Sequence, residues 1–346
     1  MINDTLLLLQ ILGPRPIYTT NVELIKNLSK EKVHELYLHA RINKIGYTYL
    51  RALEASGIIN CYPMLENELR KQREVFNKHI QSIKIISEVL TDLGIEHVFI
   101  KTIYDFPVLP SDIDVLIHCK LSREIIKTLK NKGFVWFDKG PHFVSLYNTH
   151  VDSYIPREKM NYDIDIYDEI SLNHLVYLDK DYCFENLKVN LNNHIRVPSP
   201  EYELLIQLNH SVFEQMYTLL HFYAFIRILS NTNLIKLRKL AKLTRSEKVL
   251  SYISLITLFI IKNINLSIEE ESLNALEDLA DKELQINMNG IPYRFTSAQI
   301  FQVLLEKAKN LYYLHHMLNF MLYFLYPKQI NHVLNQIILR RTRPTY

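Results

Sequence analysis

Two aspartates that stand one residue apart in an apolar run are the residues of this chain best suited to chemistry. Asp112 and Asp114 lie in the segment Ser-Asp-Ile-Asp-Val-Leu-Ile at residues 111–117. Side chains on a strand alternate between its faces, so both carboxylates point one way and the apolar side chains point the other. Like charges repel, and burial increases the cost unless a cation neutralises them. Mg²⁺ prefers carboxylate oxygens and commonly accompanies a phosphate-bearing substrate, so the pair predicts a Mg²⁺ or Mn²⁺ site.

A second stretch of the same kind supplies candidates for a third carboxylate. Asp163 and Asp165 also occupy alternate positions of a predicted strand, and Asp152 is a further rival. A neighbouring strand would bring one of these residues against Asp112 and Asp114. Three carboxylates that hold two metal ions about 3.5–4 Å apart are the arrangement used for in-line phosphoryl or nucleotidyl transfer.

The elements that must position these residues form a strand-rich stretch between helical ones. Helical spacing of apolar residues extends over residues 20–93, with a break near Pro63, and Gly94 is expected to end the last of these helices. A further helix is expected at 121–132, and the chain becomes helical again at 201–265 and 296–340, around a polar connection. The expected strands are 97–100, 112–118, 134–137, 143–147 and 162–167.

This pattern predicts an α+β protein with a small mixed sheet backed by helices. We divide the chain into an N-terminal helical region (1–93), a core that carries the paired aspartates (94–195) and a C-terminal helical region (196–346). The 346 residues suffice for one large domain or two to three smaller ones. Because the sequence contains no low-complexity linker, one compact body is expected.

The order of these elements resembles the core of the DNA polymerase β-like nucleotidyltransferase superfamily. More narrowly, it resembles the uncharacterised prokaryotic and archaeal nucleotidyltransferase-like family over residues 35–230. The resemblance implies a nucleotidyltransferase core that moves NMP from an NTP to a hydroxyl acceptor, with release of pyrophosphate. The acceptor would be a small molecule, a protein or an RNA. The matching segments are Phe-Ile-Lys at 99–101, the paired-aspartate strand, Ile-Asp-Ile-Tyr at 164–167, Val-Pro-Ser-Pro-Glu at 197–201 and Leu-Asn-His at 208–210.

The resemblance also implies a role for each matched residue. Asp112 and Asp114 would ligate the metal ions. Asp165, rather than Asp163, would complete the site and accept the proton of the attacking hydroxyl. The positions implied to contact the nucleotide are Lys101, Thr102, Ser111 and His210.

The turn after the first predicted strand departs from the family pattern. The family has Gly-Ser or Gly-Gly there, because glycine tolerates positive φ and lets backbone N–H groups approach the triphosphate. This chain has Lys101 and Thr102, and it has no glycine between Gly94 and Gly133. Pro-Val-Leu-Pro at 107–110 also replaces the family's arginine. The alternative to an enzyme is therefore a catalytically degenerate module that binds a nucleotide, a nucleic acid or a protein partner.

The composition of the chain indicates its cellular compartment more than its function. The three cysteines are far apart and fit neither a disulfide framework nor a zinc site, which predicts a reducing, cytoplasmic compartment and no disulfide-linked partner. The apolar run 249–261 is too short to cross a bilayer, so no membrane partner is expected. The apolar start at 6–12 follows Asp4 instead of a basic segment, and we expect a helix there rather than a signal peptide.

Two basic stretches bear on the question of a nucleic-acid partner. One lies between residues 235 and 250 and the other near the C-terminus, at 340–343. Either could contact a phosphate backbone, but a solvated helix face and a frayed end are the favoured interpretation. His221 is expected to be a structural histidine, although it lies on the same predicted helical stretch as His210.

Overall fold

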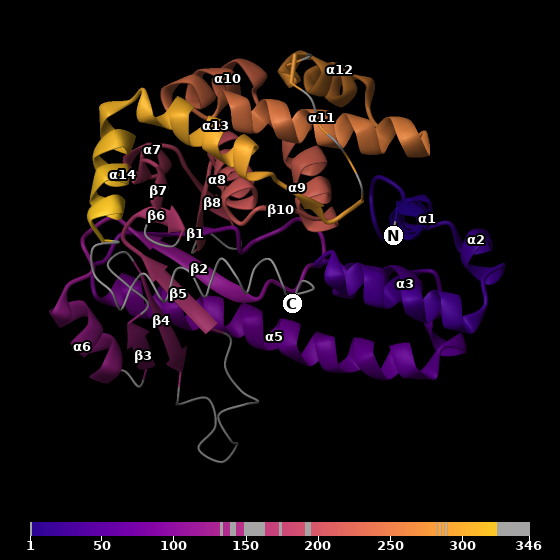
Figure 1. Cartoon of the computed structure of the whole chain (residues 1–346). Coiled ribbons are helices and arrows are strands. Elements are labelled where there is room, and N and C mark those ends of the chain that lie inside the picture. Colours follow the sequence, from indigo (N-terminus) through magenta and orange to yellow (C-terminus); the bar gives the residue numbers. More distant parts are fainter. Residues whose placement is uncertain are drawn as a thin grey trace.

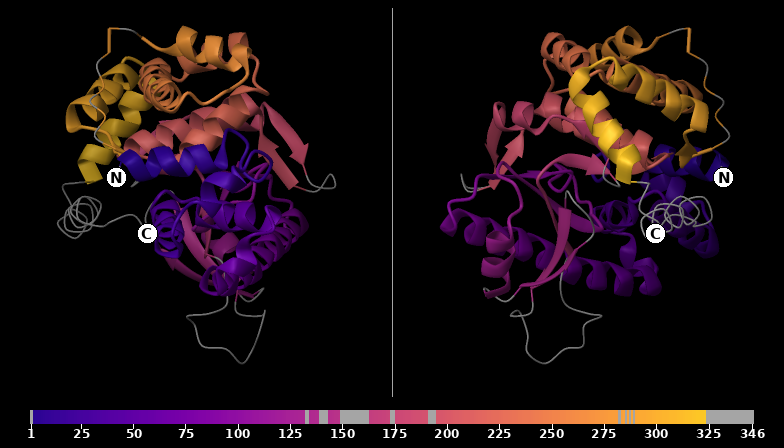
Figure 2. Two further views of the ribbon diagram at one scale, coloured as in Figure 1. Left: turned by 90° about the vertical axis from the view of Figure 1, so that its right-hand side faces the viewer. Right: turned by 60° about the vertical axis from the view of Figure 1, so that its left-hand side comes forward.

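The structure, a computed structural model, confirms the predicted α+β class. It describes residues 2–131, 134–138, 143–148, 163–172, 175–190, 195–281, 283, 284, 286, 288 and 290–323. Over these ranges a five-stranded mixed sheet lies between α5 on one side and the helices that follow residue 200 on the other (Figures 1 and 2). The three-region division of the chain stays a prediction, since apolar side chains from all three regions meet in one hydrophobic core.

Helices precede and follow the strands of the sheet in the sequence, and they pack around the sheet in the structure. The helices before the sheet are α1 (Ile2–Leu12), α2 (Val22–Lys26), α3 (Lys30–Ile42), α4 (Gly46–Ala55), the short 3₁₀ helix η1 (Ile59–Cys61) and α5 (Pro63–Asp92). Those within the strand region are α6 (Arg123–Asn131) and α7 (Lys180–Phe184). Those after it are α8 (Pro200–Phe213), α9 (Leu219–Leu229), α10 (Leu234–Leu243), α11 (Glu247–Ile264), α12 (Glu270–Leu279), α13 (Ser297–Ala308) and α14 (Leu311–Tyr323).

The strands form one main sheet and three two-stranded ribbons. The main sheet has the order β1-β2-β5-β4-β3, in which β2 and β5 are parallel and the other neighbours are antiparallel. Its strands are β1 (His97–Ile100), β2 (Asp112–Ile117), β3 (Phe134–Asp138), β4 (Phe143–Asn148) and β5 (Asp163–Tyr167). The ribbons pair β6 (Ile170–Leu172) with β7 (Leu175–Leu178), β8 (Leu187–Asn190) with β9 (Ile195–Pro198), and β10 (Met216–Tyr217) with β11 (Tyr293–Arg294).

The two faces of β2 separate apolar side chains from acidic ones. Ile113, Val115 and Ile117 are fully buried in a core shared with α5 and α6. Leu116 faces the opposite core, which the N-terminal and C-terminal helices complete. Because side chains alternate along a strand, Asp112 and Asp114 share the face of Leu116. The expected alternation is confirmed, and it directs both carboxylates toward the C-terminal helices.

The structure also shows where the predicted elements were incomplete or wrong. The five predicted strands are confirmed with small differences at their ends, and Gly94 ends α5 with φ +67°. The connection expected around 266–295 was wrong in part, because α12 forms there and buries Ala275 and Leu276. The ribbons and α7 between residues 170 and 198 were not predicted, and the predicted helical residues 324–340 lie outside the described ranges.

The described residues include no membrane-spanning helix and no disulfide. No described helix combines the length and the apolar character needed to cross a membrane. Cys61 and Cys119 are exposed and Cys183 is buried, and all three are free thiols. The cytoplasmic location stays a prediction.

His221 occupies a structural position at the start of α9. Its side chain is 7% exposed, and its Nδ1 accepts a hydrogen bond from the Thr218 backbone N–H at 3.1 Å, which closes a capping box. The pKa of His221 is lowered to about 3, chiefly by burial and also by the nearby charge of Lys44. The expected structural role agrees with these contacts.

We expect His221 to make the protein acid-sensitive. The pKa of a histidine in an unfolded chain is about 6.5. Below that pH, His221 is therefore protonated in the unfolded chain but stays neutral in the folded protein. The contribution of His221 to the free energy of unfolding should therefore fall by about 1.4 kcal/mol per pH unit as the pH falls from 6.5 toward 3, and the full contribution should be present above pH 6.5. Urea titrations from pH 5 to 8 would measure this. His221→Gln keeps a capping acceptor without titrating, and an equal slope in this variant would contradict the assignment.

Candidate metal centre

Three carboxylates from the neighbouring parallel strands β2 and β5 lie close together. Asp114 and Asp165 are 5% and 4% exposed, and Asp112 is partly buried. One ligand atom from each lies within 4.8 Å of the others. The parallel register pairs Asp114 with Asp165 across β2 and β5, so two strands distant in sequence bring the three side chains together.

The side chains of the other two candidates for the third carboxylate lie outside what the structure describes. Asp163 pairs in register with Asp112 at the edge of the same ladder, but its side chain lies outside what the structure describes. Asp152 lies outside the described residues. The structure therefore brings Asp165 to the pair, while its chemical role stays a prediction.

Lys101 is the cation of this cluster. It follows β1, whose last residue Ile100 pairs with Asp114, and its Nζ lies 3.0 Å from Asp114 Oδ2. The side chains of Lys101 and Asp114 are only 9% and 7% exposed. The backbone of Lys101 has φ +53°, in the left-handed region that favours glycine. For a residue with a Cβ, this conformation costs roughly 1–2 kcal/mol.

The electrostatics of the cluster reflect its crowded negative charge. Burial raises the pKa of Asp114 to about 7; Lys101 opposes this shift, and the carboxylates Asp112 and Asp165 add to it. Burial alone would lower the pKa of Lys101, but Asp114, Tyr177 and Asp112 together raise it above its ordinary value. A divalent cation among the carboxylates would favour their ionised forms and reverse the shift of Asp114.

The polar groups of the turn between β1 and β2 form hydrogen bonds with other residues of the protein. The Thr102 hydroxyl donates to the Ile100 carbonyl and accepts from the Asp114 N–H, both at 2.9 Å. The Lys101 N–H donates to Glu203 Oε1 at 2.9 Å. Burial raises the pKa of Glu203. Lys101 and Thr102 are the two turn residues expected near phosphate. Through the Lys101 N–H and the Thr102 hydroxyl, they hold the turn against α8 and β2.

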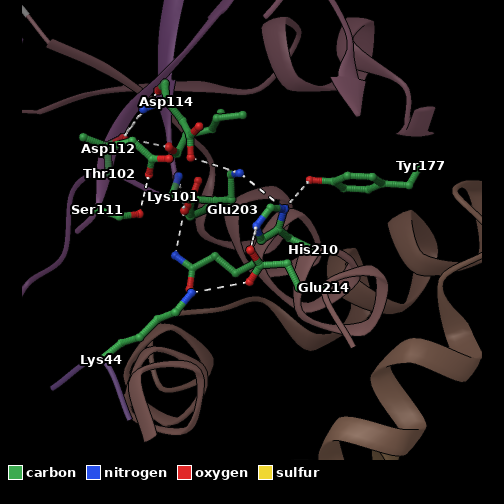
Figure 3. Close-up of polar contacts among 12 residues, drawn as sticks. Lys44, Lys101, Thr102, Ser111, Asp112, Asp114, Tyr177, Glu203, His210 and Glu214 are labelled. Carbon is green, nitrogen blue, oxygen red and sulfur yellow. Dashed lines mark hydrogen bonds and ion pairs between the residues drawn. The ribbon is translucent and has the colours of Figure 1, made fainter. Parts of the chain in front are cut away.

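A chain of polar contacts extends from Lys101 along α8 (Figure 3). His210 Nδ1 lies 3.4 Å from both Lys101 Nζ and the Tyr177 hydroxyl, so its single lone pair can accept from either group. His210 Nε2 lies 3.3 Å from Glu214 Oε1, and Lys44 Nζ lies 3.4 Å from Glu214 Oε2. Burial, and then Lys101, lower the pKa of His210, which agrees with a neutral ring that accepts at Nδ1 and donates at Nε2.

Sequence reasoning found part of this chain. Lys101 and His210 were predicted and meet, whereas Lys44, Tyr177, Glu203 and Glu214 were missed because no motif contains them. The spacing of His210 and Glu214, four residues apart on a predicted helix, was a usable signal. Ser111 lies at the exposed edge, where its hydroxyl donates to Asp112 Oδ1 at 2.9 Å and thus orients that carboxylate.

The basic stretch of residues 235–250 is partly paired. Lys236 Nζ lies 3.4 Å from Glu201, and the Arg238 guanidinium lies 3.2 Å from Asp278. Lys239 and Lys242 are exposed on α10. The basic residues at 340–343 lie outside the described ranges. These contacts agree with a solvated helix face.

The donor set of the cluster fits a hard divalent cation. Mg²⁺ and Mn²⁺ bind carboxylate oxygens, and the three aspartates offer such oxygens at one point. Asp114 Oδ1 is buried and has no hydrogen-bond partner among the described residues, which is costly for an acceptor unless an ion binds it. In comparisons with known proteins, no family model, curated protein or solved structure matches this chain.

Proposed function

We propose that the protein is a Mg²⁺-dependent nucleotidyltransferase that moves NMP from an NTP to a hydroxyl acceptor. The observation that carries the proposal is the convergence of Asp112, Asp114 and Asp165 on adjacent parallel strands. Mn²⁺ would substitute for Mg²⁺, and the use of two ions stays part of the prediction. Bound there, the metal would stabilise charge on the triphosphate and lower the pKa of an attacking hydroxyl.

The residues of the chain would divide the work as follows. The acceptor oxygen forms a bond to the α-phosphorus, the bond to pyrophosphate breaks, and Asp165 takes the proton of the hydroxyl. Lys101 lies beside Asp114 with a buried ammonium, where it would pair with a phosphate oxygen. Ser111 would keep Asp112 oriented from the open side of the cluster.

A specific observation favours the second candidate, a module that has kept the fold and lost catalysis. The Lys101 N–H, which in an intact phosphate turn would face the triphosphate, donates to Glu203 instead. Glu203 also accepts from Gln207 Nε2 at 2.7 Å, so its orientation is fixed. Such a module would bind a nucleotide, a nucleic acid or a protein partner without transferring NMP.

Two measurements separate these candidates. Calorimetry with ATP, GTP, CTP and UTP, each with Mg²⁺, tests for nucleotide binding. Incorporation of label from [α-³²P]NTPs, with pyrophosphate release as the second readout, tests for transfer into RNA, protein and small-molecule acceptors. We expect metal-dependent binding and transfer that EDTA abolishes. Binding without transfer or pyrophosphate release would favour the degenerate module, and no binding of any NTP would contradict the enzyme.

A further inference from the structure

The Lys101 ammonium occupies the position of a cation within the carboxylate cluster. It contacts Asp114 Oδ2 at 3.0 Å and lies 5.6 Å from the centre of the Tyr167 ring, on which it can make a cation–π contact. Its third neighbour is His210 Nδ1, an acceptor at 3.4 Å. The ammonium is thus held by three groups from β2, β5 and α8, and it is directed toward the aspartates rather than toward solvent (Figure 3).

Placing the Lys101 ammonium at this position costs folding free energy. The left-handed backbone of Lys101 is strained, and an ammonium loses its hydration when it is buried. Glu203 stabilises this backbone conformation by accepting a hydrogen bond from the Lys101 N–H. Strained residues of this kind persist where the surrounding structure holds them, and they cluster at functional sites.

The charge of the cluster sets how many cations it can take. With all three aspartates ionised, the carboxylates and the Lys101 ammonium together carry a net charge of −2. One divalent cation neutralises this charge. A second would leave a net charge of +2 in a buried site, which is as large in magnitude as the −2 that the first ion neutralised, unless a polyanionic ligand arrives with it.

We propose that Lys101 is a built-in counter-cation of the aspartate cluster, so that without nucleotide the site binds one divalent ion and not two. This inference rests on the proposed metal site but not on the transfer reaction. According to this inference, the charge of Lys101 weakens metal binding and restricts the cluster to one divalent ion. It also gives a physical reason for a lysine at a left-handed backbone position, where glycine is the usual residue.

The wild-type protein provides the first test, with Mn²⁺ as the probe and no nucleotide present. Equilibrium dialysis should give one Mn²⁺ per chain, and electron paramagnetic resonance should show an isolated ion without the exchange splitting of a Mn²⁺ pair. Two ions per chain, or a coupled pair, would overturn the inference and leave the proposed metal site standing. No Mn²⁺ binding would overturn both.

Lys101→Met removes the charge and keeps most of the volume. Because the repulsion between the ammonium and the ion disappears, the first Mn²⁺ should bind at least tenfold more tightly. Two ions would leave a net charge of +1 in this variant instead of +2 in the wild type, so a second ion should bind more readily than in the wild type. Lys239→Met is the matched control, since it removes the same charge from an exposed position on α10, outside the polar chain, and should change the affinity less than twofold. Unchanged or weaker Mn²⁺ binding in folded Lys101→Met would overturn the inference.

Circular dichroism checks that Lys101→Met is folded. Lys101→Arg keeps the charge and is the second variant, with one Mn²⁺ and an affinity within threefold of wild type expected. A second Mn²⁺ in Lys101→Arg would show that volume rather than charge sets the stoichiometry, and this result also counts against the inference. The wild-type stoichiometry decides the matter even where the methionine variant does not fold.

Discussion

Asp114→Asn is expected to lower the rate of nucleotidyl transfer at least ~10³-fold, which corresponds to about 4 kcal/mol of lost transition-state stabilisation. Asp114 is the most constrained of the three proposed ligands. It lies between Asp112 and Asp165, contacts Lys101, and has a buried oxygen without a hydrogen-bond partner among the described residues. An asparagine amide offers one neutral oxygen in place of the carboxylate, so a hard divalent cation should bind far more weakly.

The measurement pairs the transfer assay with Mn²⁺ binding and thermal unfolding. Asp181→Asn is the matched control, because Asp181 is an exposed acid near His118, away from the cluster, and its replacement should leave the rate unchanged. Asp114→Asn should remain folded, since asparagine can still accept from Lys101, but it should lose the stabilisation that Mn²⁺ gives the wild type. Undiminished transfer in folded Asp114→Asn would rule out the proposed mechanism.

The acidic part of the site was predictable because it depends on local rules. Alternation along a strand places Asp112 and Asp114 on one face, and the same rule applies to Asp165. The sequence does not show which strand is the neighbour of β2. The parallel pairing with β5 skips the strands between them in sequence, so the choice of Asp165 could only be made there by resemblance.

The basic part of the site was less predictable because its contacts join distant segments. Lys44 follows α3, Tyr177 lies on β7 and Glu214 ends α8, and no sequence period relates them. The turn at Lys101 illustrates a different limit. A left-handed residue is normally inferred from glycine, so a lysine in that conformation gives no signal. The ribbons between residues 170 and 198, whose strands are three or four residues long, were missed, although β1 of similar length was predicted.

Lys307 is a second buried lysine, and it lies where α13 meets the rest of the molecule. Its side chain is fully buried, and Nζ donates to the carbonyls of Tyr177 and Thr244 at 2.7 and 3.0 Å and to the Ser246 hydroxyl at 3.3 Å. The ammonium also lies 4.7 Å from the centre of the Tyr313 ring. Burial lowers the pKa of Lys307 to about 7. Through Tyr177, which contacts His210, this lysine supports the wall of the candidate site.

The stabilisation by Lys307 should therefore grow with pH. Its folded pKa of about 7 is below the unfolded value of about 10.4, so between these values the unfolded chain binds more protons and stability rises with pH. At pH 7 the hydrogen bonds offset the cost of burying the charge, and Lys307→Met should differ little from wild type. By pH 9 the wild type should be the more stable by roughly 2–3 kcal/mol, at about 1.4 kcal/mol per pH unit.

Urea titrations of the wild type and Lys307→Met from pH 7 to 9 measure this difference. The matched control is Lys309→Met, which removes an exposed lysine at the end of the same helix and should leave the pH dependence unchanged. A constant difference between wild type and Lys307→Met would mean that the lysine remains charged throughout. The Tyr177 and Thr244 carbonyls and the Tyr313 ring would then stabilise a full ammonium, although the part of the chain that the structure describes gives it no carboxylate partner.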